Sequence, residues 1–130
     1  MQDLAWVMLG CALGGMARLW VSNTVGHRLG EAFPWGTLAV NVTGAFAIGI
    51  LAAVAASGEG WFGEPTLWLF AGIGFLGSYT TVSAFSLQTL LLMQNGQRWQ
   101  AAGNVALSLG LCLPAAALGL AAGTGLTAMD

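Results

Sequence analysis

Polar residues recur at helical spacing inside apolar segments of this chain and could bind an ion. In PWGTLAVNVTG, Asn41 follows Thr37 by four positions, so both side chains lie on one helix face. Asn104, Ser108 and Cys112 repeat the same spacing and form a stripe about 12 Å long. Amides and hydroxyls donate hydrogen bonds, so the two faces together predict a polar track suited to an anion. An interhelical hydrogen bond that holds a bundle together is the alternative role for Asn41.

The stretch GFLGSYTTVSAF, residues 74–85, combines glycines and hydroxyl side chains in the middle of an apolar segment. Such a composition predicts a break in the helix near Gly77 to Ser83. A break frees main-chain carbonyls, which suit a small hard cation. Hydroxyls and the positive edges of aromatic rings suit an anion. We therefore expect backbone in this stretch to be paired or to line a cavity.

Arg18 is the only charged residue that falls inside an apolar segment. It lies about 10 Å of helix rise from the end of that segment. The side chain could extend to the lipid headgroups. Alternatively, it could line an aqueous vestibule and attract anions through its local field.

The composition identifies the environment in which these helices must lie. Hydrophobic residues make up 57% of the 130 residues and charged residues only 6%, whereas soluble domains carry about a quarter charged residues. The chain therefore predicts an all-α integral membrane protein, a single domain over residues 1–130 in a lipid bilayer. Each span needs about 20 apolar residues, and four segments qualify: residues 4–25, 35–56, 66–93 and 99–122.

Several classes of function are disfavoured by the same residues. No Asp or Glu lies within a predicted span, so a proton-coupled exporter of cations lacks its carboxylate. We expect no enzyme, because no nucleophile–base pair or metal-ligand cluster is present. The formal net charge of −2 does not indicate a nucleic-acid partner. Cys11 and Cys112 have no metal-binding spacing and are interpreted as small core residues rather than a disulfide.

Glycines and arginines bear on assembly and orientation. Gly10 and Gly14 form a small-residue face that lets helices approach closely, within one chain or between subunits. We expect a homo-oligomer, with packing inside one chain as the alternative. Arg28 and Arg98 fall in loops on the same side of the membrane, which is a weak orientation signal.

Three motifs together resemble the Fluc (CrcB) family of fluoride channels. GFLGSYTTVSAF is similar to the family signature GF-x-G-x-x-TTFSTF, PWGTLAVNVTGAFAIG to its second-span motif, and GCALGGMAR to its first. The resemblance covers essentially the whole chain. It implies a four-helix membrane bundle with a broken third transmembrane helix, assembled as an antiparallel homodimer of dual topology in the bacterial inner membrane.

The resemblance also implies the bound ions and their residues. A central Na⁺ that is not transported would be held by the main-chain carbonyls of Gly77 and Thr80 in both subunits. Asn41 would donate to fluoride and Phe85 would be a pore phenylalanine. The remaining pathway residues would be Ser83, Asn104, Ser108, Val82 and Arg18, the last matching the family's first-span arginine.

This chain departs from the signature at two positions. Val82 replaces the first phenylalanine of TTFSTF and Ala84 replaces its second threonine. We expect a passive channel that lets the cell export fluoride and reduces its toxicity. A non-conducting structural or partner subunit of the same fold is the alternative, because Val82 removes an aromatic ring from the pathway.

Overall fold

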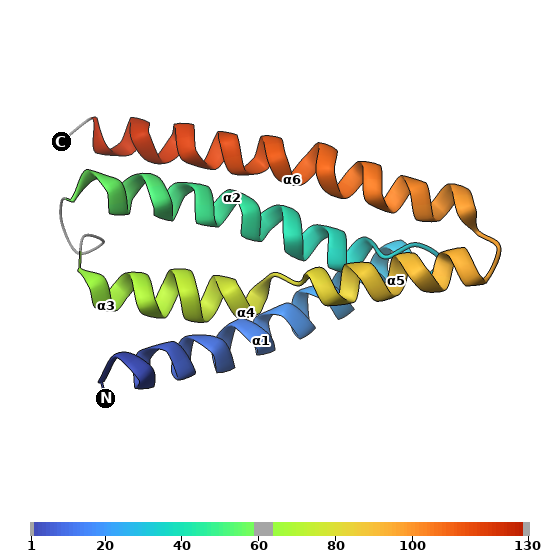
Figure 1. Ribbon diagram of the computed structural model, residues 1–130, viewed down its shortest axis with the longest axis horizontal. Helices are drawn as coiled ribbons and strands as arrows, with labels where there is room; N and C mark the ends of the chain where they lie inside the picture. Colours follow the sequence, from blue (N-terminus) through green and yellow to red (C-terminus); the bar gives the residue numbers. More distant parts are fainter. Residues whose placement is uncertain (1, 59–63, 129–130) are drawn as a thin grey trace.

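The computed structural model describes residues 2–58 and 64–128, and every regular element in these ranges is helical. The described residues form seven elements, labelled in Figure 1 where there is room. They are α1 (Gln2–Leu29), α2 (Trp35–Ser57), α3 (Pro65–Leu67), the π-helix η2 (Trp68–Leu76), α4 (Gly77–Tyr79), α5 (Val82–Gln94) and α6 (Arg98–Thr127).

Four stretches within the described residues are long and apolar enough to cross a membrane: Gln2–Leu29, Trp35–Ser57, Pro65–Gln94 and Arg98–Thr127. The third of these stretches comprises α3, η2, α4 and α5. Large apolar side chains are exposed along α1, α5 and α6, whereas the buried cluster around Val40, Leu76 and Tyr79 is small. This distribution fits a bundle whose outer surface faces lipid.

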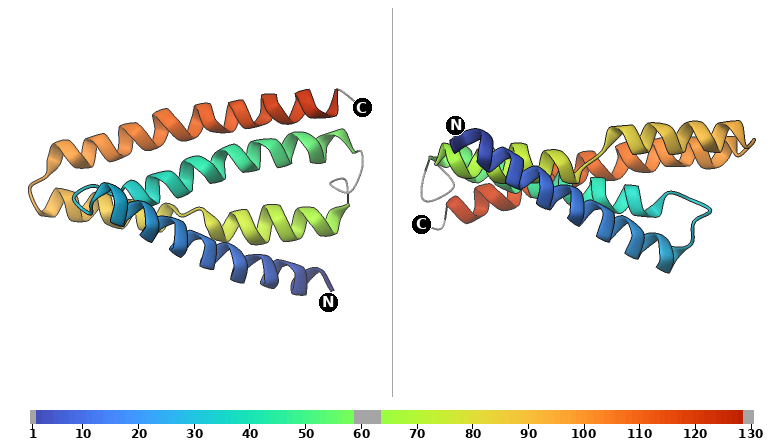
Figure 2. Two further views of the ribbon diagram at one scale, coloured as in Figure 1. Left: turned by 180° about the vertical axis from the view of Figure 1, so that it is seen from behind. Right: turned by 90° about the horizontal axis from the view of Figure 1, so that it is seen from below.

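Helices α2 and α6 lie side by side along most of their lengths (Figures 1 and 2). Glycines make this close approach possible. A Cβ atom added at Gly49 would collide with the Ala116 carbonyl oxygen, and one added at Gly119 would collide with that of Phe46. The two helices therefore pack main chain against main chain, as small residues permit in membrane bundles.

Helix α1 packs on η2 in the same manner. A Cβ atom at Gly10 would meet the Phe70 carbonyl oxygen, and one at Gly14 would meet the carbonyl oxygen of Phe75. The small-residue face of α1 is thus used inside one chain. Of the two explanations offered for these glycines, packing within one chain is the one that the structure describes, so they no longer support a homo-oligomer.

Thr80 and Thr81 separate α4 from α5 and are not helical. Thr80 has φ −76° and ψ 158°, and Thr81 has φ −153° and ψ 120°, so both have extended backbone. The Oγ1 atom of Thr81 accepts a hydrogen bond from the Ala84 N–H at 3.2 Å and caps the first turn of α5. We call these two residues the interruption.

Beyond the interruption the helices diverge. The end of α1 and the start of α2 separate from α5 and α6, as the right-hand view of Figure 2 shows. A cavity between α1, α2 and α5, described below, is lined by both polar and apolar side chains.

Candidate functional site: two cavities at the helix interruption

Asn41 of α2 bonds to the main chain of the interruption. Its Nδ2 atom donates to the Thr81 carbonyl oxygen at 2.9 Å, and its Oδ1 atom accepts from the Thr81 N–H at 2.8 Å. A primary amide carries two N–H donors, so one N–H of Asn41 is not used by Thr81. Asn41 therefore joins α2 to the interruption, and its second N–H is a further donor.

Thr81 was not singled out by the sequence analysis, although it has the most hydrogen bonds at the interruption. Besides the two bonds to Asn41, its Oγ1 atom accepts from the Ala84 N–H and lies 3.2 Å from the Ser83 Oγ atom. A threonine that precedes an apolar helical run is a typical N-cap, and this signal could have identified Thr81.

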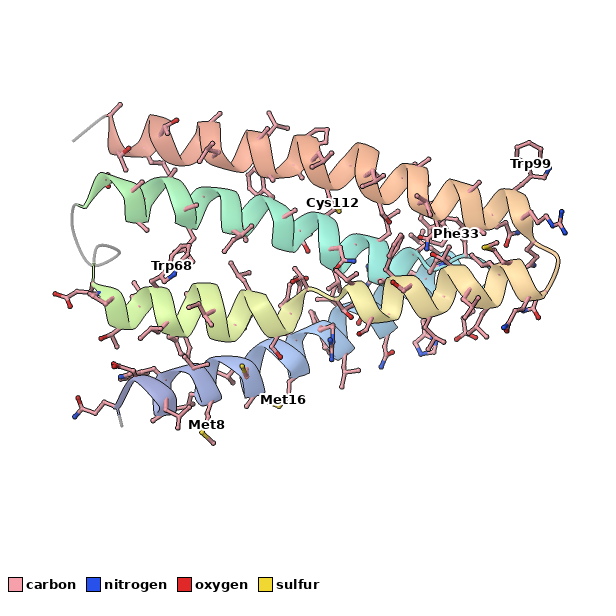
Figure 3. All side chains as sticks on the ribbon, viewed as in Figure 1. Met8, Met16, Phe33, Trp68, Trp99 and Cys112 are labelled. Atoms are coloured by element: carbon pink, nitrogen blue, oxygen red, sulfur yellow. The ribbon has the colours of Figure 1, made fainter. Side chains whose placement is uncertain are left out.

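A cavity of about 480 Å³ lies on one side of the interruption, and we call it the Asn41 groove. It brings together residues of α2, η2, α4, α5 and α6 with the interruption itself. Four sequence-predicted residues of the fluoride pathway line it: Asn41, Val82, Phe85 and Ser108. Cys112 also lines the groove, and Figure 3 labels its side chain between α6 and α2.

A second cavity, of about 390 Å³, lies between α1, α2 and α5, and we call it the Arg18 cavity. Arg18 and Ser83 line it together with hydroxyls of Ser22 and Thr37. Among the described residues that line it, none is acidic. The half-buried Arg18 places a positive charge beside hydroxyl groups, which favours an anion over a cation.

Thr81 lines both cavities. The interruption therefore forms part of the wall between the Asn41 groove and the Arg18 cavity. Six of the predicted pathway residues are divided accordingly. Arg18 and Ser83 lie on one side, and the other side has Asn41, Val82, Phe85 and Ser108.

Asn104 lies apart from both cavities. It is 2% exposed, and its Nδ2 atom donates to the Thr89 Oγ1 atom at 2.9 Å. Thr89 in turn donates to the Phe85 carbonyl oxygen at 2.7 Å. The stripe predicted on α6 is thus divided: Ser108 and Cys112 line the Asn41 groove, whereas Asn104 joins α6 to α5.

Gln88 is a polar residue that the sequence analysis missed. It lines the Arg18 cavity and also a smaller cavity of about 190 Å³ beside the α1–α2 connection. Its Oε1 atom is buried without a hydrogen-bond partner. Its position inside the third apolar segment was the available signal, because amides are costly there.

Gly77 and Thr80, the predicted cation ligands, both line the Asn41 groove. In a continuous helix the Thr81 N–H would donate to the Gly77 carbonyl, but here it donates to Asn41. The extended backbone of Thr80 likewise takes its carbonyl out of the helical pattern. Within residues 2–58 and 64–128, no group of three or more acidic, His or Cys side chains could hold a metal.

Comparisons with known proteins identify the family. The family model described as CrcB-like protein, Camphor Resistance (CrcB), matches residues 5–120. The chain belongs to the CrcB-like family. A curated protein of Rhodopseudomonas palustris named fluoride-specific ion channel FluC 2 is 59% identical over 121 residues, covering 93% of this chain and 92% of its own.

Two further relatives of this CrcB-like protein carry related names. The fluoride-specific ion channel FluC 2 of Bradyrhizobium diazoefficiens is 55% identical, covering 92% of this chain and 88% of its own. The fluoride-specific ion channel FluC of Methylocella silvestris is 48% identical, covering 91% and 90%. The resemblance drawn from the three motifs is confirmed, and the chain is a multi-pass membrane protein.

Proposed function

We propose that this CrcB-like protein is a fluoride-selective channel that exports the ion passively. The observation that carries the proposal is 59% identity, across 93% of the chain, to a protein named fluoride-specific ion channel. The geometry agrees with it, because hydrogen-bond donors and a phenylalanine share one groove in a membrane bundle. A pore of this kind needs no catalytic group, so we propose no enzymatic activity.

The two cavities suggest a division of tasks along the pathway. Fluoride is strongly hydrated, so a pore must replace the hydrogen bonds of water with its own donors. In the Asn41 groove, the free N–H of Asn41 and the Ser108 hydroxyl are such donors, and Phe85 offers its ring edge. In the Arg18 cavity, the guanidinium attracts anions and the Ser83 hydroxyl can donate to them.

A structural Na⁺ that is not transported is the proposed cofactor, and the residues present fit it. Hard cations take oxygen ligands, and the Gly77 and Thr80 carbonyls are both released from the helical pattern. These two carbonyls would hold the ion, which would supply a fixed positive charge beside the groove. Two carbonyls are too few for a complete shell, so a second subunit would provide the remaining ligands.

A second copy of the chain is the proposed partner. Val82 and Gly77 line the groove and are both exposed, Val82 to 77%. A partner that packs over the interruption would cover them and close the groove toward lipid. The family resemblance makes this partner antiparallel, with both orientations in the bacterial inner membrane and the third transmembrane helix broken at the interruption.

Fluoride efflux from liposomes that contain the purified protein tests the proposal, with chloride as the control ion. We expect rapid fluoride efflux after addition of a potassium ionophore and no chloride efflux above that of empty liposomes. No fluoride efflux from well-incorporated protein would overturn the proposal. It would favour the alternative, a non-conducting subunit in which Val82 has replaced a pore phenylalanine.

A further inference from the structure

The contact between Asn41 and Thr81 has the form of a paired peptide group. A side-chain amide has the same donor and acceptor as a peptide bond, and here both bond to the N–H and the C=O of one residue, at 2.8 and 2.9 Å. Thr81 is 8% exposed. A buried main-chain group without a partner is costly, so Asn41 supplies what the interrupted helix cannot.

Asn41 is distinctive among the polar contacts between helices. Thr43 contacts the Tyr79 hydroxyl at 2.9 Å, and Asn104 contacts the Thr89 hydroxyl, so each of these pairs joins two side chains. Among the side-chain hydrogen bonds of the described residues, those of Asn41 are the ones that hold the main chain of another helix.

The acceptor that Asn41 offers also affects the hydrogen bonding of the Gly77 carbonyl. If the Thr81 N–H lost Asn41, its nearest replacement would be the Gly77 carbonyl, four residues earlier, which is the bond of a continuous helix. Forming that bond would pair the carbonyl with an N–H donor and leave it less able to bind a cation. Asn41 thus competes with Gly77 for one N–H and keeps the Gly77 carbonyl available.

We propose that Asn41 is a positioning residue that fixes the interruption and thereby sets the affinity of the cation site formed by Gly77 and Thr80. The proposal rests on the proposed function, because it takes the Na⁺ site as given. It differs from anion binding by the same side chain, which uses the other N–H. One amide therefore links the cation site to the anion groove, and loss of that amide changes both.

Two readouts that do not depend on fluoride test the proposal. The first is amide hydrogen exchange at Thr81 by NMR, for wild type, Asn41→Leu and Asn41→Asp. Leucine keeps the approximate volume and removes both hydrogen bonds, whereas aspartate keeps the acceptor for the Thr81 N–H. We expect exchange at Thr81 to be roughly tenfold faster in Asn41→Leu and close to wild type in Asn41→Asp.

The second readout is the Na⁺ concentration that gives half of the maximal rise in thermal stability. We expect this midpoint to rise roughly tenfold or more in Asn41→Leu, because the Gly77 carbonyl must first lose its new hydrogen bond to the Thr81 N–H before it can bind Na⁺. Asn104→Leu is the matched control, since it removes a buried amide that bonds to a side chain on α5. It should lower the overall stability and leave the Na⁺ midpoint unchanged.

The outcomes separate this proposal from the proposed function. An unchanged Na⁺ midpoint in Asn41→Leu, or a Thr81 amide that stays protected there, would overturn it even if wild-type protein conducts fluoride. A wild-type protein whose stability does not depend on Na⁺ would overturn it too. Failure of fluoride efflux alone leaves both readouts intact and counts against the channel function instead.

Discussion

Val82 and Phe85 stand about one helical turn apart at the start of α5, and both line the Asn41 groove. They differ in what they offer an anion. Phe85 has a ring with a positive edge, whereas Val82 has no quadrupole. Val82 is also 77% exposed within one chain, so nothing in that chain prevents a larger side chain at this position.

The substitution Val82→Phe should raise the rate of fluoride efflux. It adds a second ring edge to the groove, and the exposed position leaves room for the ring within one chain, so overpacking is avoided there. Liposome efflux at equal protein density measures the effect, with Val82→Leu as a control for side-chain bulk. An equal gain from leucine would show that bulk, and not the ring edge, sets the rate.

The substitution Phe85→Ile should reduce fluoride efflux nearly to the level of empty liposomes. Isoleucine keeps most of the apolar volume but removes the quadrupole, so thermal stability should change by less than about 1.5 kcal/mol. Efflux and thermal unfolding are measured on the same preparation. Full efflux in a stably folded Phe85→Ile would mean that the ring only packs.

The four-residue spacing along α6 predicted one common face for Asn104, Ser108 and Cys112, but the structure separates Asn104 from the other two. Ser108 and Cys112 share the Asn41 groove, but Asn104 is buried against α5. An α-helix turns about 100° per residue, so each step of four residues drifts by about 40° and the stripe from 104 to 112 rotates by about 80°. The Asn41–Thr81 pair joins residues forty positions apart, and no local pattern encodes that contact.

At the scale of elements, the helices of the bundle pack with main-chain atoms in direct contact at glycine positions. Gly119 and Gly123 of α6 face α2, where an added Cβ at Gly123 would lie 2.8 Å from the Ile50 carbonyl oxygen. Gly125, on the same helix, has nothing within 4 Å of an added Cβ. The glycines of α6 therefore divide into those that packing requires and those that it does not.

Gly119→Ala should destabilise the protein by about 2 kcal/mol, because its methyl group would collide with the Phe46 carbonyl and force α2 and α6 apart. Gly125→Ala is the matched control. It should be neutral or stabilising by up to about 1 kcal/mol, since alanine favours the helix. Thermal unfolding in detergent compares them, and equal effects of the two substitutions would contradict the packing argument.

The sequence predicted the elements better than their details. Four apolar segments were expected and four helical stretches long enough to span are present among the described residues. The helices extend past the expected apolar limits, to Leu29 in α1 and Thr127 in α6, because hydropathy marks where lipid ends and not where a helix must stop. The π-helical stretch η2 packs against α1 and α2, and composition does not encode that packing.

At the scale of the whole molecule, two of the three arginines lie at one end. Arg28 lies in the last turn of α1 and Arg98 begins α6, and these two helix ends lie at the same end of the bundle in Figure 1. A single orientation would place both arginines in the cytoplasm. The proposed antiparallel dimer instead requires both orientations.

Labelling from one side of the membrane measures the orientation. In a Cys11→Ser, Cys112→Ser background, Gln97→Cys places one thiol in the turn before α6. We expect an impermeant maleimide to label about half of the protein in intact cells and all of it after permeabilisation. Labelling of all or none in intact cells would establish a single orientation.

Replacement of Na⁺ by N-methylglucamine should lower the thermal stability of the assembled protein. A ligand that binds only the folded state stabilises it by mass action, and the large organic cation cannot reach the Gly77 and Thr80 carbonyls. Thermal unfolding at constant ionic strength measures the difference. Identical melting curves in the two salts would count against a structural cation.

The interruption sets the end of one helical run beside the beginning of another. Helix macrodipoles give about half a negative charge to the C-terminal end of α4 and about half a positive charge to the N-terminal end of α5. This separation of charge is permanent, because it belongs to the peptide groups and not to side chains. The field that these peptide groups add to the two cavities, both of which Thr81 lines, therefore does not change with the acidity of the cell.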